Sequence, residues 1–105
     1  MYKNIFDTHA HYEDEQFDCD RDELLSSFPE NGISGVVTCG TDIITSEKSI
    51  ALAEKYPFIY GAAGVHPSST AELDEEKFAE LRVLAQSGKI VAIGEIGLDY
   101  YWEEP

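Results

Sequence analysis

Cysteine is scarce in this sequence, and basic residues are few. Cys19 and Cys39 are isolated, with no CxxC pair, so we expect reduced thiols and no disulfide framework. Seven lysines and arginines stand against 21 aspartates and glutamates, which gives a formal net charge of −14. Because non-specific nucleic-acid binding depends on cations that neutralise phosphates, this balance argues against a protein that coats nucleic acid.

Long apolar runs and several familiar site motifs are also absent. The apolar stretches are far shorter than the roughly 20 residues of a membrane span, and MYKNIFDTH lacks the apolar run of a signal peptide. The sequence contains no GxGxxG or GxxxxGK loop to cradle phosphates and no GxSxG elbow to hold a serine nucleophile. We therefore expect a soluble, cytoplasmic protein that uses neither a nucleotide-binding loop nor a serine triad.

The sequence does contain a regular alternation of strand and helix patterns. Apolar or β-branched runs predict four strands, over residues 3–10, 34–40, 58–65 and 89–98. Segments with helical spacing of apolar residues separate these runs. Nearly continuous apolar strands that alternate with helices are typical of a parallel sheet, so we predict an α/β fold with the order βαβαβαβ.

Polar residues predict where the three helices begin. Asp20 opens the first helix, with the spacing of a capping box to Glu23. Thr45 or Ser46 is expected to cap the second helix, and Asp74 the third.

Two histidines close the first predicted strand, in the segment DTHAH. His9 and His11 are two positions apart, so both side chains lie on one face of a strand. Imidazole suits zinc, manganese, iron or nickel, and Asp7 could act as the acceptor that orients one of the rings. Taken alone, the pair fits a metal site and two polar residues at a strand end equally well.

Two further candidate residues also lie at strand ends. His66 follows the third predicted strand in GVHP, and Glu95 lies in GEIGLDYY between Gly94 and Gly97. Ligands of open parallel sheets and of barrels bind at the carboxyl ends of the strands. Two imidazoles and a carboxylate can form a metal-binding set there. A loop histidine before a proline and an acid bonded to a backbone N–H remain the alternatives for His66 and Glu95.

Together these segments resemble the TatD-like family of metal-dependent deoxyribonucleases, which belongs to the amidohydrolase-type barrels. IFDTHAH, GVHP and GEIGLDYY occur in this order, and the similarity runs from Asn4 to Tyr101. The resemblance implies a TIM (β/α)8 barrel. Since such a barrel needs about 250 residues, residues 1–105 would form a single partial domain, the N-terminal half with four strands and three helices.

The resemblance also implies ligands and a reaction. His9 and His11 would bind one of two divalent metal ions, which could be magnesium, manganese or zinc. Glu95 would reach both ions, and His66 would contact the substrate phosphate or a neighbouring group. The implied activity is metal-dependent cleavage of phosphodiester bonds in DNA or short oligonucleotides, as a 3′-5′ exonuclease. The acidic surface is compatible with this activity, because bound metal ions supply positive charge locally.

The sequence departs from the family pattern in two places. Tyr12 and Glu13 follow the histidine pair, where the family usually has an aliphatic residue and an aspartate or asparagine. The family's remaining histidines and its catalytic aspartate lie on later strands, beyond Pro105. We therefore expect no general base in this chain and little or no nuclease activity from it alone. The alternatives are a non-catalytic half barrel that self-associates through its edge strands or complements another half, and a different phosphoesterase or amidohydrolase.

Overall fold

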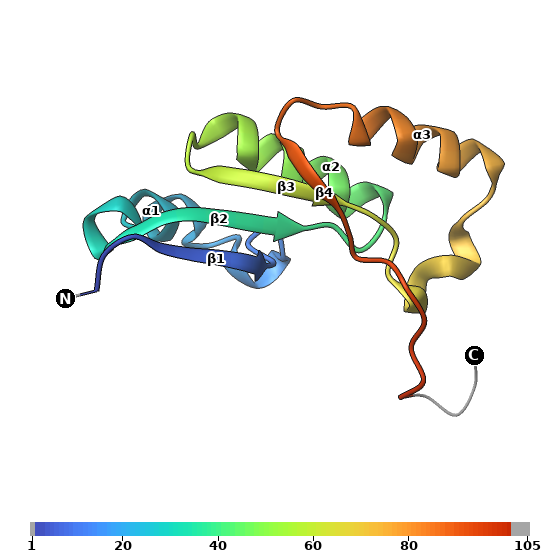
Figure 1. Cartoon of the computed structure of the whole chain (residues 1–105), viewed down its shortest axis with the longest axis horizontal. Helices are drawn as coiled ribbons and strands as arrows, with labels where there is room; N and C mark the ends of the chain where they lie inside the picture. The colour runs from blue at the N-terminus through green and yellow to red at the C-terminus, as the bar shows by residue number, and fades with distance from the viewer. Residues whose placement is uncertain (1, 102–105) are drawn as a thin grey trace.

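The computed structural model describes residues 2–101 and contains one four-stranded parallel sheet (Figure 1). The elements, in chain order, are β1 (Ile5–Ala10), the 3-10 helix η1 (Glu15–Phe17), α1 (Arg21–Ser26), the 3-10 helix η2 (Pro29–Asn31), β2 (Ile33–Cys39), α2 (Ile43–Lys55), β3 (Ile59–Ala63), the 3-10 helix η3 (Pro67–Glu72), α3 (Glu75–Ala85) and β4 (Ile90–Ile93). The sheet order is β1-β2-β3-β4, and every neighbouring pair is parallel. The predicted βαβαβαβ order is therefore confirmed, although β4 is shorter than the expected strand over residues 89–98.

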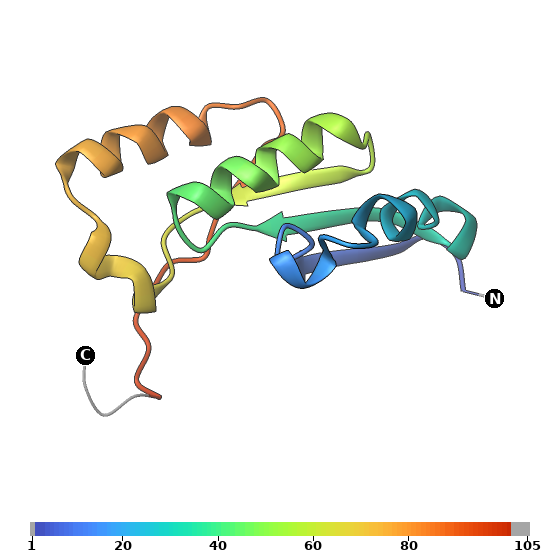
Figure 2. The same cartoon turned by 180° about the vertical axis from the view of Figure 1, so that it is seen from behind.

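The helices α1 and α2 cover one face of the sheet, as the two opposite views in Figures 1 and 2 show. The main core lies between these layers and comprises Leu25, Phe28, Val36, Leu52, Ala53, Tyr56 and Ile59. Because side chains alternate along a strand, Val37 of β2 points to the other face and packs with Cys39 and Ala62. None of the helices in residues 2–101 is long and apolar enough to cross a membrane.

The sheet face opposite α1 and α2 keeps apolar side chains in contact with solvent. Phe6 of β1 stacks on Tyr60 with ring centroids 6.3 Å apart, yet it remains 50% exposed. Ile93 of β4 and Ile96, three residues beyond it, line a pocket with Val37, Cys39 and Ala62 of this face, and they are 55% and 64% exposed. Within residues 2–101, no helix covers this face (Figures 1 and 2).

Aspartate side chains cap the N-termini of the two longer helices, α2 and α3. At α2, Asp42 Oδ1 accepts the Thr45 N–H at 2.8 Å, and Thr45 Oγ1 accepts the Asp42 N–H at 3.0 Å, which completes a capping box. The prediction of Thr45 or Ser46 as the N-cap is wrong, because Thr45 is the third residue of the helix and Ser46 is buried. Asp74 caps α3 as predicted, by accepting the Lys77 N–H at 2.8 Å.

The shortest α-helix lacks such a cap. Asp20 precedes α1, but its side chain makes no capping hydrogen bond, so the predicted capping box with Glu23 is wrong. The helix is held to the preceding loop in another way. The Arg21 guanidinium donates to the carbonyl oxygens of Tyr12 and Asp14 at 2.6 and 2.7 Å.

Replacing Asp42 with alanine should lower the free energy of unfolding by about 1 kcal/mol, because an N-cap side chain typically contributes about 0.5–2 kcal/mol. The change leaves the Thr45 N–H without its partner at the start of α2. Asp20→Ala is the matched control and should cost less than about 0.5 kcal/mol, since its side chain makes no capping bond. Urea unfolding of both variants tests this; equal losses would contradict the assigned caps.

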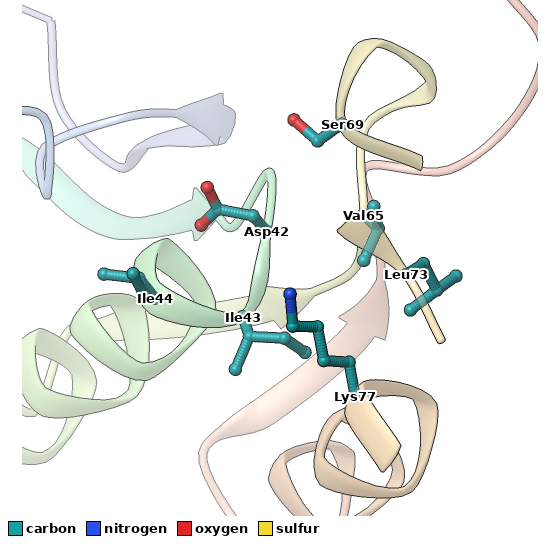
Figure 3. A pocket seen from close by; sticks show the side chains of 7 residues that line it. All are labelled: Asp42, Ile43, Ile44, Val65, Ser69, Leu73 and Lys77. Atoms are coloured by element: carbon teal, nitrogen blue, oxygen red, sulfur yellow. The ribbon is translucent and has the colours of Figure 1, made fainter. Parts of the chain in front are cut away.

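A small cavity separates the first turn of α2 from η3 and α3 (Figure 3). It measures about 90 Å³ and is lined by Asp42, Ile43, Ile44, Val65, Ser69, Leu73 and Lys77. Asp42 already serves as the helix cap, and Lys77 extends from α3 toward the first turn of α2. With one carboxylate and a mainly apolar lining, this cavity offers no set of metal ligands.

Candidate metal centre

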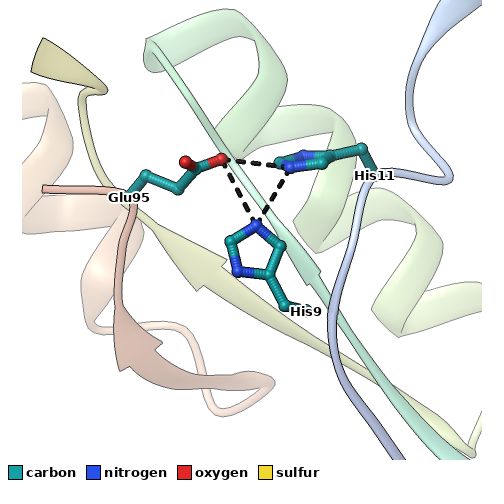
Figure 4. A group of neighbouring side chains, drawn as sticks. All are labelled: His9, His11 and Glu95. Carbon is teal, nitrogen blue, oxygen red and sulfur yellow. Dashed lines mark hydrogen bonds and ion pairs between the residues drawn. The ribbon is translucent and has the colours of Figure 1, made fainter. Parts of the chain in front are cut away.

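The three predicted metal ligands meet at the carboxyl end of the sheet. His9 lies in β1, His11 directly follows it, and Glu95 lies two residues beyond β4. Their side chains point toward one another in Figure 4. The three ligand atoms all lie within 4.8 Å of one another, and this is the one such group of three among residues 2–101.

The spacing of the donor atoms suits a single metal ion. His9 Nε2 lies 3.1 Å from His11 Nε2, and Glu95 Oε2 lies 3.1 Å from His11 Nε2 and 3.6 Å from His9 Nε2. An ion about 2.0–2.2 Å from each donor separates donors by about 2.8–3.1 Å at octahedral angles and by about 3.3–3.6 Å at tetrahedral angles. The residues present therefore fit a divalent cation without rearrangement of the backbone.

Glu95 reaches the histidines because the chain turns back across the sheet after β4. The strands β1 and β4 are at opposite edges. The Gly94 N–H donates to the carbonyl of Ala63 at 2.9 Å, and the Glu95 N–H donates to the carbonyl of Gly40 at 2.8 Å. The segment thus runs over the ends of β3 and β2. A Cβ on Gly64 would lie 2.5 Å from the carbonyl carbon of Gly94, so glycine permits this close passage.

His11 is held in the tautomer that a metal ligand needs. Its Nδ1 lies 2.9 Å from the backbone carbonyl of Cys39. Because a carbonyl can only accept, Nδ1 carries the proton and Nε2 of the neutral ring is a free lone pair. That lone pair faces Glu95 Oε2 and His9 Nε2, and these negative or electron-rich atoms approach closely only if a cation or proton lies between them.

His66 lies beside the cluster in the opposite tautomer. Its Nδ1 accepts the Ser68 N–H at 3.0 Å, so the neutral ring carries its proton on Nε2. That nitrogen lies 3.7 Å from Glu95 Oε1, whereas the histidine pair faces the other carboxylate oxygen, Oε2. His66 therefore offers a hydrogen-bond donor at the edge of the site, not a third imidazole ligand.

Asp7 contacts the histidine pair differently from our expectation. Its Oδ1 accepts the backbone N–H of His9 at 3.1 Å and so supports the main chain of β1. The acceptors next to the His11 ring are the Cys39 carbonyl and Glu13, whose Oε1 lies 3.3 Å from Nδ1. We predicted no role for Glu13, which in the sequence was only a departure from the family pattern, whereas the structure buries it to 5% exposure.

The surroundings of the cluster favour a cation. Burial raises the pKa of the Cys39 thiol, and the nearby carboxylates of Glu95 and Glu13 raise it further. Burial also raises the pKa of the Tyr12 hydroxyl, with a contribution from Asp7. Both cysteines are free, as predicted, with Cys19 exposed and Cys39 buried. Negative charge thus accumulates around the donor atoms, where a metal ion would neutralise it.

Comparison with known proteins identifies relatives over most of the chain. A family model described as TatD related DNase matches residues 6–105. YabD of Bacillus subtilis, an uncharacterized metal-dependent hydrolase, is 39% identical over 100 residues, which cover 95% of this chain and 39% of YabD. The 3′-5′ ssDNA/RNA exonuclease TatD of Cronobacter sakazakii is 40% identical over 96 residues, which cover 91% of this chain and 36% of that protein.

Solved structures share the same arrangement of strands and helices. A TatD family hydrolase from Entamoeba histolytica superposes with a TM-score of 0.84 and 30% identity, over 95% of this chain and 39% of that one. YJJV, a TatD homolog from Escherichia coli K12, gives a TM-score of 0.81 and 28% identity, over 94% and 39% of the two chains. This chain therefore spans little more than a third of the length of these relatives, and its fold corresponds to the N-terminal portion of their TIM barrels. The chain belongs to the TatD-related DNase family.

Proposed function

We propose that His9, His11 and Glu95 hold a divalent cation in a protein that removes nucleotides from the 3′ end of single-stranded nucleic acid. The observation that supports this most directly is the triangle of donor atoms, with edges of 3.1, 3.1 and 3.6 Å. The relative from Cronobacter sakazakii is named a 3′-5′ ssDNA/RNA exonuclease, which supports the choice of substrate. The family resemblance adds a second ion that Glu95 would share.

The side chains have separate tasks in this proposal. When bound, a divalent cation polarises a phosphoryl oxygen and lowers the pKa of a coordinated water. His9 and His11 supply neutral nitrogens, while Glu95 supplies negative charge through Oε2. The Nε2–H of His66, beside Glu95 Oε1, is placed to donate to an oxygen of the scissile phosphate.

The acidic surface limits how the substrate can bind. With a net charge of −14, the chain repels a long polyanion, and binding depends on the cation and the His66 donor. Strand ends and short oligonucleotides satisfy this condition because few phosphates approach the protein. We further propose that residues 1–105 do not turn over alone, since residues 2–101 offer one group of three ligands, whereas the family resemblance implies two ions and a catalytic aspartate on later strands.

The activity can be tested with 5′-labelled single-stranded DNA and RNA oligonucleotides of equal sequence. The full-length protein should shorten them from the 3′ end in the presence of Mg²⁺, Mn²⁺ or Zn²⁺, and EDTA should stop the reaction. The chain of residues 1–105 should leave both substrates intact under the same conditions. EDTA-resistant cleavage would contradict the role of the metal centre, and cleavage by residues 1–105 would contradict their proposed inactivity.

Replacing His66 with alanine should lower kcat/KM of the full-length protein about 10- to 100-fold, because a hydrogen bond to a charged group contributes about 1.5–3 kcal/mol. Its metal content should stay unchanged, since Nδ1 accepts the Ser68 N–H and Nε2 carries a proton. Steady-state kinetics and elemental analysis test both parts. Loss of metal from this variant would make His66 a ligand and contradict the assigned tautomer.

A further inference from the structure

Glu13 is a buried carboxylate whose two oxygens both have partners. Its side chain is 3% exposed, and Oε2 accepts the Thr38 hydroxyl at 2.6 Å. Oε1 lies 3.3 Å from His11 Nδ1, which carries a proton because it also lies 2.9 Å from the Cys39 carbonyl. Both carboxylate oxygens therefore have a hydrogen-bond donor within reach. Burial of such a group is costly unless it is paired in this way.

Glu13 is held from two different elements, β2 and α1. Thr38 is fully buried in the middle strand β2, so its hydroxyl has a fixed position. The main chain around Glu13 is held from α1, where the Arg21 guanidinium donates to the carbonyls of Tyr12 and Asp14 at 2.6 and 2.7 Å. A third bond from the same guanidinium reaches the Glu13 carbonyl at 3.3 Å. Glu13 is thus held at its main chain by Arg21 and at its carboxylate by Thr38.

We propose that Glu13 is a positioning residue that, together with Thr38, orients His11 and keeps its Nε2 free for the metal. This inference rests on the proposed metal-binding function of His11. A carboxylate on the distal nitrogen fixes the tautomer of a histidine ligand and raises its basicity, so its loss usually lowers metal affinity 10- to 100-fold. The neutral Cys39 carbonyl also orients the His11 ring, but it carries no negative charge. Only Glu13 can therefore raise the basicity of the ring by its charge.

Glu13→Gln keeps the size of the side chain and removes its charge, and Glu15→Gln is the matched control. Glu15 is exposed in η1, two residues away, and its replacement changes the net charge equally. Zinc affinity, measured at one pH in competition with a chromophoric chelator, should fall at least about 10-fold for Glu13→Gln and stay within about twofold for Glu15→Gln. Equal affinities of the two variants would overturn the proposal.

A second measurement separates this proposal from the function of the site. In the metal-free chain, 15N NMR should show His11 protonated on Nδ1, with a larger Nε2-protonated fraction in Glu13→Gln. If the chain binds no zinc, the proposed metal centre is wrong, but the tautomer of His11 still tests the role of Glu13. A His11 tautomer that is the same in Glu13→Gln and in the wild type would overturn that role. Should Glu13→Gln not fold, Thr38→Val removes only the hydroxyl donor to Glu13 and should weaken zinc binding about fivefold. Unchanged binding in Thr38→Val would count against it.

Discussion

Replacing His9 and His11 together with alanine should abolish metal binding by this chain. The two imidazoles supply two of the three donors in the cluster. The one remaining donor is the carboxylate of Glu95, whose side chain is 22% exposed. Loss of an outer partner of a ligand already costs 10- to 100-fold in affinity, so loss of both ligands should exceed about 100-fold. The wild-type chain should carry about one divalent ion after gel filtration, measured by inductively coupled plasma mass spectrometry, and the variant none.

A stability measurement gives an independent check on the same variant. Ligands that bind only the folded state stabilise it, so added Zn²⁺ should raise the unfolding temperature of the wild type and leave that of the double variant unchanged. Retention of metal by the double variant would place the ion elsewhere in the acidic chain. Absence of metal from the wild type would contradict the proposed binding of a cation by His9, His11 and Glu95.

Gly64→Ala should disrupt the metal centre from a position that contacts no metal. An added Cβ would lie 2.5 Å from the Gly94 carbonyl carbon and 2.6 Å from the Glu95 carbonyl oxygen. Both neighbours are backbone atoms, so the segment that carries Glu95 has to move. Overpacking of this kind costs about 1–3 kcal/mol of folding free energy, and the displaced carboxylate should weaken zinc binding as well.

Gly88→Ala is the matched control for Gly64→Ala, because it adds the same Cβ where no backbone lies close. A Cβ at Gly88 meets nothing within 4 Å, so the change should alter stability by less than about 1 kcal/mol and leave zinc affinity unchanged. Urea unfolding and zinc titration of the two variants provide the comparison. If Gly64→Ala bound zinc as tightly as Gly88→Ala does, the passage of residues 94–95 over Gly64 would not control the position of Glu95.

The strand-end positions of the candidate residues were predictable, because they depend on patterns of period two and on the alternation of strands with helices. His9 and His11 share a face for the first reason, and His66 and Glu95 reach the same edge for the second. The resemblance to a metal-dependent family then assigned ligand roles that these patterns alone left open. The geometry of the donor atoms agrees with those roles.

The contacts that were not predicted depend on residues distant in sequence or on loop conformation. Glu13 lies outside the strand, so strand periodicity says nothing about it, and its burial requires Thr38 from β2. Asp42 was overlooked as a cap because the helix begins before the polar residues, Thr45 and Ser46, that we took as its start. The turn of residues 94–95 across β3 and β2 is set by backbone hydrogen bonds, which leave no pattern of residue types.

The crossing of the chain after β4 also has a consequence for the order of events in folding. His11 and Glu95 come from opposite edges of the sheet, with β2, β3 and their helices between them in the chain. A cation can therefore be bound tightly only after all four strands have paired. Interactions that form after the folding transition state slow unfolding and change the folding rate little. Metal in this centre would thus prolong the lifetime of the native state without helping the chain to reach it.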